Sequence, residues 1–367
     1  MKPKLGNKKF DKPLFGLTLA LIVIGLVAVS SASSVLSFQR FGNNNYFFFR
    51  QIWFSVAGIA VMLAVSRIDY RFWKRWSGGL LIFGVMALAA VLLPALGFKV
   101  GGSRSWFNFG SFFIQPSEFL KPLVIFYLAS WFDRKKEAET NFWFGILPPL
   151  IAAGAAIGLV VLEPDLGTAL VLTAIVFTVL FAAGAKLKYL ASLLALGLAA
   201  GWALIRTAPY RAARITSFFD PSIDPLGIGY HINQALLAIG SGGFWGLGFG
   251  NSRQKHNYLP EPIGDSIFAI LAEEFGFFRI AIIILLYAAF AVVGTKLAAG
   301  APDKFSRLAA IGITGWVILQ AVVNIAAISN LFPLTGIALP FLSYGGSSLL
   351  ALCFGVGVML NISRHKA

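Results

Sequence analysis

The chain has 367 residues, of which 58% are hydrophobic and only 12% are charged, and its mean hydropathy is +0.79. This composition excludes a water-soluble globular protein and predicts an integral membrane protein. The formal net charge of +15 is typical of nucleic-acid-binding proteins, but the placement of the basic residues indicates another cause.

Apolar stretches long enough to cross a bilayer recur along almost the whole chain. Each is predicted to be helical, because lipid offers the backbone no hydrogen-bond partner, and the short alternating segments of a β-barrel do not occur. We expect an all-α integral membrane protein, with residues 1–367 forming one polytopic domain. About ten spans are predicted, at residues 13–37, 45–65, 78–98, 112–131, 142–162, 166–184, 187–206, 266–295, 307–329 and 343–363.

The basic residues gather in alternate loops. If the first span starts in the cytoplasm, most of the 30 lysine and arginine residues fall on the cytoplasmic side, which is the positive-inside pattern. Both termini are therefore predicted to be cytoplasmic, and the excess charge reflects topology rather than nucleic-acid binding. The loops and tails in question are residues 1–12, 67–75, 134–136, 186–188, 296–307 and 364–366.

The fourth predicted span contains an acid and a base, Glu118 and Lys121, within the sequence Gln115-Pro-Ser-Glu-Phe-Leu-Lys121. Residues three apart share a helix face, and opposite charges in a bilayer pair with each other or turn toward the bundle interior. Two interpretations stay open: an ion pair that serves packing, and a pair that lines a substrate cavity.

A tight turn on the outer side, Glu163-Pro-Asp-Leu-Gly-Thr168, joins the fifth and sixth spans. Asp165 could cap the sixth helix, with Thr168 three residues further on. The same turn could instead direct these polar side chains into a cavity on the outer face, and the sequence does not decide between the two.

Residues 207–264 form the one long extramembrane segment, between spans seven and eight, and they face outward in this topology. A loop of this length that carries aromatic residues among its glycines is usually functional, and we expect short helices across the outer surface. Its basic residues could hold pyrophosphate or anionic lipid head groups. They are Arg211, Arg214, Arg253 and Lys255.

The eighth apolar stretch, residues 266–295, would make a helix of roughly 45 Å against a hydrocarbon core of about 30 Å. We expect its first turns to stand outside the lipid, with Glu273 and Glu274 facing water or a cavity. Asp265 lies just before it, at a membrane boundary. A carboxylate there is costly under lipid and acceptable in a wet cavity, so Asp265 is either a helix cap or a functional group.

Six motifs occur in order along the chain, and together they resemble the SEDS family (shape, elongation, division, sporulation), to which FtsW, RodA and SpoVE belong. The resemblance covers nearly the whole chain. Within it, Gly248–Lys255 looks more like FtsW than RodA. The motifs are Gly102-Ser-Arg104-Ser-Trp106, Gln115-Pro-Ser-Glu118, Pro164-Asp-Leu-Gly-Thr168, Asp224-Pro-Leu-Gly-Ile-Gly-Tyr230, Leu259-Pro-Glu261 and Pro340-Phe-Leu-Ser-Tyr-Gly-Gly-Ser-Ser348.

The resemblance implies a peptidoglycan glycosyltransferase of the bacterial plasma membrane that polymerises lipid II on the extracytoplasmic side and releases undecaprenyl pyrophosphate. The family's essential aspartate matches Asp265, which is predicted to be the general base. The family often has His-Thr-Asp-Phe there, whereas this chain has Ile263-Gly-Asp-Ser266, and the family's Gly-Tyr-Gln is Gly229-Tyr-His231. The predicted substrate-binding residues are Arg104, Glu118, Lys121, Asp165, Thr168, Arg211, Arg214, Gln234, Lys255, Glu261 and Ser343.

The resemblance also implies partners and leaves rival functions. A class B penicillin-binding protein is expected to dock its membrane helix on spans eight and nine, beside the small residues Ala281, Gly294, Gly312 and Gly315. A divalent cation, Mg²⁺ or Mn²⁺, could assist pyrophosphate departure. The rivals are a lipid II flippase, which would use the buried charges Glu118, Lys121 and Arg279, and a non-catalytic scaffold for the transpeptidase.

Overall fold

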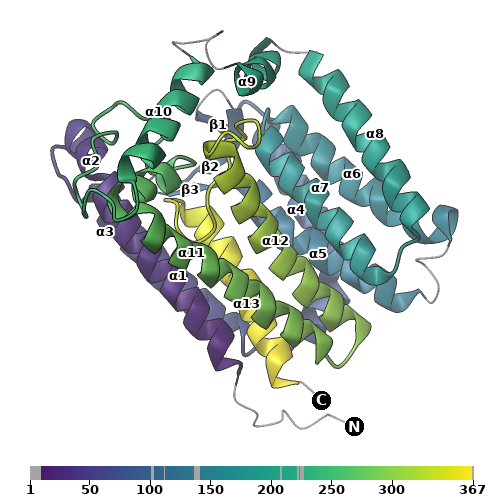
Figure 1. Ribbon diagram of the computed structural model, residues 1–367. Helices are drawn as coiled ribbons and strands as arrows, with labels where there is room; N and C mark the ends of the chain where they lie inside the picture. The colour runs from purple at the N-terminus through teal and green to yellow at the C-terminus, as the bar shows by residue number, and fades with distance from the viewer. Residues whose placement is uncertain are drawn as a thin grey trace.

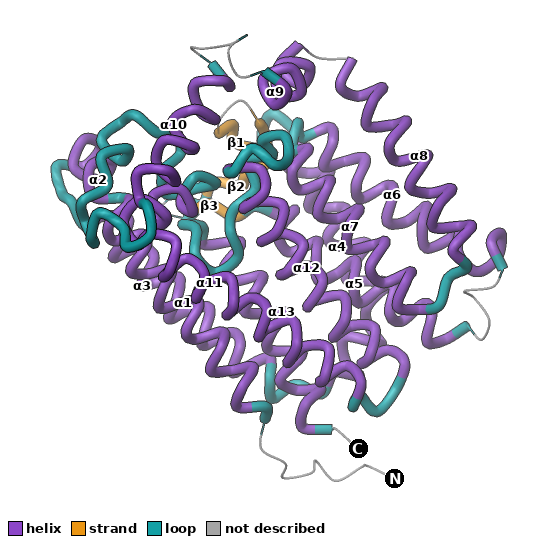
Figure 2. Tube along the Cα trace, in the orientation of Figure 1, coloured by secondary structure: helices purple, strands orange, loops and turns teal. Residues whose placement is uncertain are grey.

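The computed structural model describes residues 10–100, 103–110, 112–135, 141–206, 209–220, 223 and 227–365. Long helices run side by side as one bundle, and a small sheet and most of the loops gather at one end of it (Figures 1 and 2). The helices are α1 (Lys12–Ala32), α2 (Ser34–Phe41), α3 (Tyr46–Val65), α4 (Tyr70–Leu92), α5 (Pro116–Arg134), α6 (Leu147–Leu162), α7 (Leu166–Ala183), α8 (Leu187–Arg206), α9 (Pro209–Phe219), α10 (Ile228–Gly242), α11 (Ile267–Ala299), α12 (Lys304–Ile328) and α13 (Gly346–Arg364), with a π-helical turn η1 (Phe142–Ile146) before α6.

Each of the ten predicted spans coincides with a long helix, which confirms a helical membrane protein. Among the described residues, eight helices are long and apolar enough to cross a bilayer. The two predicted spans that fall short are α5, which carries several charged residues, and α8, whose apolar stretch is shorter. The count of ten therefore stays a prediction.

The two ends of the bundle differ in character. The start of α1 and the end of α13 lie at one end, while α9, α10 and the small sheet lie at the other (Figure 1). Within the described residues, the segment after α8 therefore lies across from the termini, as the predicted topology requires. We call the two ends the terminal end and the loop end.

The sequence did not predict the sheet at the loop end. Three antiparallel strands lie in the order β1-β2-β3, where spans 78–98 and 112–131 were expected to continue as helix. Helix α4, which corresponds to the predicted span 78–98, instead starts at Tyr70, because the Asp69 carboxylate caps it by accepting from the Arg71 N–H (2.9 Å). The strands are β1 (Gly97–Val100), β2 (Ser103–Asn108) and β3 (Phe113–Ile114).

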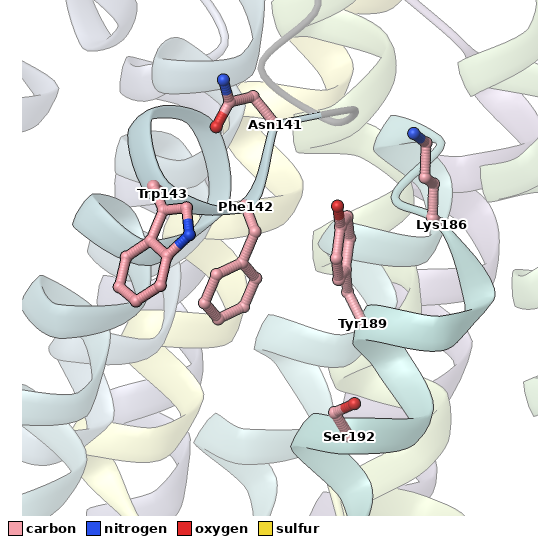
Figure 3. A pocket seen from close by; sticks show the side chains of 6 residues that line it. All are labelled: Asn141, Phe142, Trp143, Lys186, Tyr189 and Ser192. Carbon is pink, nitrogen blue, oxygen red and sulfur yellow. The ribbon is translucent and has the colours of Figure 1, made fainter.

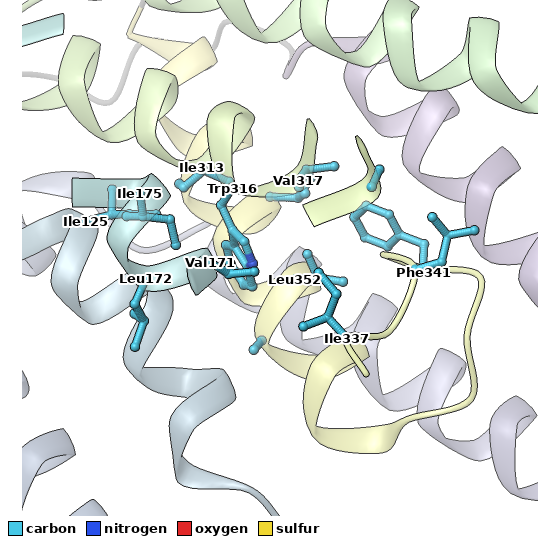
Figure 4. Close-up of a cluster of buried hydrophobic side chains, with 14 of the residues drawn as sticks. Ile125, Val171, Leu172, Ile175, Ile313, Trp316, Val317, Ile337, Phe341 and Leu352 are labelled. Atoms are coloured by element: carbon cyan, nitrogen blue, oxygen red, sulfur yellow. The ribbon is translucent and has the colours of Figure 1, made fainter. Parts of the chain in front are cut away.

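The centre of the bundle is a dry cluster around Trp316 of α12, with side chains of α5, α7 and α13 packed against it (Figure 4). Ile337 and Phe341, from the segment between α12 and α13, pack into the same cluster and are 5% and 2% exposed. This segment is thereby fixed to the rigid core of the molecule.

Three of the four small residues expected to receive a partner helix, the glycines, face inward, so the prediction is wrong for them, and Ala281 is half-buried. A Cβ on Gly312 would lie 2.6 Å from Ile125 Cγ2, and one on Gly315 would lie 2.6 Å from Thr178 Cγ2. Gly294 likewise faces Thr314 of α12. These glycines let helices of this chain approach one another, as small residues do inside membrane bundles.

The overlong eighth span is divided by Gly276, whose backbone has φ 73° and ψ 175°. This conformation is open to glycine and strained for other residues. It ends a first, buried section of α11, and the remaining section is of ordinary spanning length.

The expectation that Glu273 and Glu274 face water or a cavity is wrong, because each is only 1% exposed. Glu273 accepts hydrogen bonds from the Arg253 N–H (3.0 Å) and the Ser252 hydroxyl (2.5 Å). Glu274 pairs with Lys255 (3.1 Å). Both carboxylates therefore fasten the loop after α10 onto α11.

Candidate active site

Asp265 lies in the turn that precedes α11, at the loop end of the bundle. Its side chain is half-buried. Ser266 occupies the N-cap position of α11, and no side chain makes a capping hydrogen bond there. Asp265 is therefore not the helix cap that position alone suggested, and its carboxylate is not committed to helix stability.

Burial raises the pKa of the Asp265 carboxyl to about 6, although the charge of Arg214 and local hydrogen bonds oppose this shift. At neutral pH the group is mostly ionised. A carboxylate with a pKa close to the working pH is a better proton acceptor than an ordinary aspartate, which is the usual tuning of a general base.

A segment that we call the strap, residues 335–345, holds the turn in which Asp265 lies. The Ser343 hydroxyl donates to the Gly264 carbonyl (2.7 Å), and the Tyr344 N–H donates to the Ile263 carbonyl (2.9 Å). Gly336 passes close to the carboxylate, since a Cβ there would lie 3.9 Å from Asp265 Oδ2. Ser343, predicted to bind substrate, thus holds the turn that carries Asp265.

Two amide side chains, one turn apart on α12, fix the strap and the turn together. Asn324 donates from Nδ2 to the carbonyls of Asp265 (2.9 Å) and Ile337 (2.8 Å). Gln320 donates from Nε2 to the Ala338 carbonyl (2.8 Å). Both amides are almost completely buried, at 2% and 1% exposed, so these bonds are shielded from competing water.

The buried pair in α5 connects to this network. Lys121 Nζ lies 2.7 Å from Glu118 Oε1 and 3.3 Å from the side-chain oxygen of Gln320. Trp316 Nε1 donates to the same Gln320 oxygen (2.8 Å). The prediction of an intramembrane ion pair is confirmed, and through Gln320 the pair reaches the strap. Substrate binding by Glu118 and Lys121 stays a prediction.

The turn between α6 and α7 also lies against the strap. Asp165 caps α7 by accepting from the Thr168 N–H (2.9 Å), so the capping role is confirmed. Its other oxygen accepts from Gln115 Nε2 (3.3 Å). A Cβ on Gly167 would lie 2.6 Å from the Thr335 carbonyl oxygen, so the N-terminus of α7 touches the strap that reaches Asp265.

Glu163, one residue beyond α6, is fully buried, and neither of its carboxylate oxygens has a hydrogen-bond partner. Burial, aided by the charge of Asp165, raises the pKa of its carboxyl to about 8. Glu163 is therefore protonated at neutral pH.

His231 of α10 takes the position where the family has a glutamine, and the sequence left it without a role. Its Nε2 lies 2.7 Å from the Ser266 hydroxyl oxygen, and that hydroxyl donates to the Pro260 carbonyl (2.7 Å). The histidine must then carry its proton on Nε2 and donate. Burial lowers the pKa of His231 to about 4, so the ring is neutral at neutral pH. It supports the residue next to Asp265.

Two of the predicted basic site residues, Arg214 and Arg104, lie in different surroundings. Arg214 of α9 is half-buried, and its charge acts on both Asp265 and His231. Arg104 of β2 is half-buried beneath Gly97 of β1. Arg214 is thus the cation that the structure brings to the aspartate.

Lys255 lies inside the loop that follows α10 and is 5% exposed. Its ammonium group donates to the Gly250 carbonyl (2.6 Å) and the Ser31 hydroxyl (3.0 Å) besides pairing with Glu274. These contacts leave no exposed ammonium group, so Lys255 holds the loop rather than presenting a charge to pyrophosphate.

The remaining predicted site residues lie at the loop end or outside the residues that the structure describes. Glu261 is exposed in the turn before Asp265 and has a positive φ of 46°, and its charge acts on His231. Gln234 is half-buried on α10, three residues after His231. The side chain of Arg211 lies outside the described part of the chain, as do Gly102 and residues 224–226 of two motifs.

The described residues do not fit a divalent cation held by protein groups alone. Among them, no three His, Cys, Asp or Glu side chains come together as a ligand set. The oxygens of Asp165 already accept two N–H donors. The expectation of Mg²⁺ or Mn²⁺ stays a prediction.

Sequence reasoning missed Gln320 and Asn324. A signal for them was present, because two amides four residues apart in a predicted span share one helix face. Polar groups on one face of a membrane helix mark the interior of a bundle or a functional path.

The chain is similar to known proteins over nearly its whole length. Residues 12–367 match the family model described as "Cell cycle protein", FtsW/RodA/SpoVE. The chain is 42% identical to stage V sporulation protein E of Bacillus subtilis, over 97% of each chain. It is 40% identical to the probable peptidoglycan glycosyltransferase FtsW of Trichlorobacter lovleyi, over 97% of this chain and 93% of the relative.

Two solved structures share the fold over nearly the full length. One, described as structural coordination of polymerization and crosslinking by a peptidoglycan synthase complex, superimposes with a TM-score of 0.82 at 28% identity, covering 97% of this chain and 98% of the other. The rod shape determining protein RodA of Thermus thermophilus gives a TM-score of 0.72 at 27% identity, covering 97% of each chain.

Proposed function

Since the chain belongs to the FtsW/RodA/SpoVE family and is a multi-pass peptidoglycan glycosyltransferase, we propose that it polymerises lipid II into glycan strands, with Asp265 as the general base. The observation that carries the proposal is the state of Asp265. It is half-buried, free of any capping role, raised in pKa to about 6, and held by the strap and by Asn324.

The proposed step is a displacement at the anomeric carbon of the donor sugar. Asp265 accepts the proton of the acceptor's 4-hydroxyl while that oxygen bonds to the anomeric carbon, and the bond from this carbon to the pyrophosphate oxygen breaks. Undecaprenyl pyrophosphate leaves with the electron pair. A positioned base contributes about 10²–10⁴-fold to such a step.

The leaving group needs little help from an acid, because pyrophosphate is stable as an anion. Charge stabilisation suits it better, and Arg214 is the described cation whose field reaches Asp265. Two catalytic carboxylates, as in glycoside hydrolysis, are therefore not required. The neutral His231 supports the turn through Ser266 and does not compete for the acceptor proton.

The site also suits a lipid-linked substrate. Asp265 precedes α11, and the start of α11 lies at the end of the bundle where the helices give way to loops and the sheet (Figure 2). Sugars can therefore stay in water while a polyprenyl tail lies along the helices. The positive-inside pattern predicts that this end is extracytoplasmic.

The experiment that tests the proposed function separates it from the rival functions. Purified chain is incubated with lipid II, and glycan products are resolved on a gel. The same preparation in liposomes is assayed for lipid II translocation by fluorescence quenching. The proposal expects polymer in the first assay. Translocation without polymer would indicate a flippase, and neither activity, with growth retained by an Asp265→Asn variant, would indicate a scaffold.

We further propose a class B penicillin-binding protein as partner, supported by the likeness to a synthase complex that couples polymerization and crosslinking. The inward-facing glycines cannot form the docking face. The second section of α11 instead exposes an apolar stripe, with Phe278 at 49%, Leu285 at 65% and Val292 at 50%. Alanine at Phe278 and Leu285 should reduce copurification of the partner, whereas Val322→Ala on α12 should not. Equal copurification by all variants would remove α11 as the docking helix.

A further inference from the structure

A groove of about 640 Å³ lies between the π-helical turn η1 and the first turns of α8 (Figure 3). Both elements are at the terminal end of the bundle (Figure 1). The reaction proposed above makes no use of this groove. Its lining residues are Asn141, Phe142, Trp143, Lys186, Tyr189 and Ser192.

The groove combines an aromatic wall with a polar rim. Phe142 and Tyr189 face each other with ring centroids 5.3 Å apart, so a residue from each element forms the wall. Trp143 is 70% exposed beside them. Asn141 and Lys186 lie on opposite sides of one end of the groove in Figure 3. Aromatic side chains with polar tips are typical of the level where lipid head groups meet the hydrocarbon.

Among the described residues, the rim of the groove carries positive charge. None of the ion pairs within the described ranges involves the exposed Lys186. Lys188 lies over the Tyr189 ring, 5.1 Å from its centroid, and adds a second cation. By the positive-inside pattern this end faces the cytoplasmic leaflet, whose anionic lipids are drawn to basic pockets between membrane helices.

The helices that flank the groove are apolar and loosely joined. Further along them, Ile151 of α6 and Leu194 of α8 are 63% and 53% exposed. Within the described residues, helix α8 contacts α9 and α7, and no comparable contact joins it to α6. Acyl chains can therefore lie between α6 and α8 directly below a head group at the rim.

We propose that this groove binds an anionic glycerophospholipid, with its phosphate at Lys186 and its acyl chains between α6 and α8. The lysine supplies the charge, and Asn141 and the Tyr189 hydroxyl lie where a glycerol head group would reach them. The lipid would join η1 to α8 and so stabilise a helix that has few protein contacts of its own.

The test uses the purified full chain in detergent. Retention of added phosphatidylglycerol and of phosphatidylcholine is measured by native mass spectrometry and by the shift in thermal unfolding. Wild type is compared with Lys186→Gln, with Lys186→Arg, and with Lys296→Gln as a control. Lys296 is exposed in the last turn of α11, also at the terminal end. Because Lys186 and Lys296 are both exposed, none of these changes threatens folding.

Phosphatidylglycerol should bind more tightly than phosphatidylcholine, and Lys186→Gln should weaken it about fivefold. Lys186→Arg and Lys296→Gln should leave it near the wild-type value. Equal binding of both lipids, or an equal loss in Lys296→Gln, would overturn the proposal in favour of ordinary surrounding lipid. Full competition by glycerol 3-phosphate would indicate a site for a soluble phosphate, and preferential retention of lipid II would indicate a substrate-entry site; either result overturns it too.

Discussion

Replacing Asn324 with leucine tests whether the hydrogen-bond network around Asp265 positions the base. Leucine keeps the branched shape and the number of side-chain heavy atoms, although its methyl groups are bulkier, and it lacks the amide that donates to the carbonyls of Asp265 and Ile337. The side-chain oxygen of Asn324 is buried without a partner, so its own removal costs nothing. The effect therefore comes from the two carbonyls that lose their donors.

The magnitude follows from these two bonds. Each buried carbonyl left without a donor costs about 1–3 kcal/mol, so the variant should lose roughly 2–6 kcal/mol of unfolding free energy. The carbonyl of Asp265 is then free to move. A displacement of about 1 Å at a catalytic group can reduce the rate about 100-fold, so we expect kcat for lipid II polymerisation to fall by a factor of that order. KM should change little, because no substrate contact is removed.

Asn361→Leu is the matched control. Asn361 is also a fully buried amide with two hydrogen bonds, donating to the Ser66 carbonyl (3.0 Å) and accepting from the Tyr70 N–H (2.8 Å). It lies near the end of α13, at the terminal end of the bundle, far from Asp265.

The assay measures thermal unfolding in detergent and initial rates of glycan synthesis per folded molecule. Both variants should lose comparable stability, and only Asn324→Leu should lose kcat. The positioning role is refuted if folded Asn324→Leu keeps near-normal kcat, or if Asn361→Leu loses as much.

Three further predictions follow from the titrating and buried charges. The value of kcat/KM should rise with pH through about 6, because only ionised Asp265 accepts a proton, and at pH 5 it should be about tenfold below its plateau. Arg214→Gln should move this rise to higher pH, since the Arg214 charge lowers the pKa of Asp265. A flat profile from pH 5 to 7 would exclude Asp265 as the base. Burial raises the pKa of Glu163 to about 8, so the folded state loses stability as pH rises from about 4.5 to 8, by up to about 5 kcal/mol in unfolding free energy. Glu163→Gln should remove this loss and therefore raise the thermal midpoint at pH 9. The same change in midpoint at pH 9 as at pH 4 would contradict this. Lys121→Met leaves Glu118 charged and unpaired in the bundle and should lower the unfolding free energy by about 3–5 kcal/mol. The double variant with Glu118→Gln should recover most of this stability. If the double variant also recovers activity, the ion pair only supports packing.

The sequence was sufficient to predict the helices, because hydropathy and length directly reflect what a bilayer requires of a backbone. It was insufficient where apolar residues serve another purpose. Residues 94–98 continue the apolar character of α4, yet Gly97 and Phe98 belong to a strand of the small sheet. Likewise, Gly276 looked like an ordinary glycine of a membrane helix, and only its positive φ shows that the helix is divided there.

At the candidate site, the sequence predicted a role for Asp265 but not the contacts that hold it. The Ser343 hydroxyl reaches Gly264, and Asn324 reaches Asp265, across long stretches of chain whose packing no local pattern specifies. Lys255 and the glutamates of α11 show the converse. Lys255 was expected to bind substrate and the glutamates to face water or a cavity, but the fold pairs them with one another and with loop N–H groups in the interior.

The most direct measurement is glycan polymerisation from purified lipid II by Asp265→Asn, compared with wild type at equal folded concentration. The amide keeps the size of the side chain and cannot accept the proton of the attacking hydroxyl. If Asp265 is the base, polymer formation should fall by at least about 100-fold while lipid II binding persists. Glycan chains of near-normal yield and length from a well-folded Asp265→Asn protein would contradict that assignment.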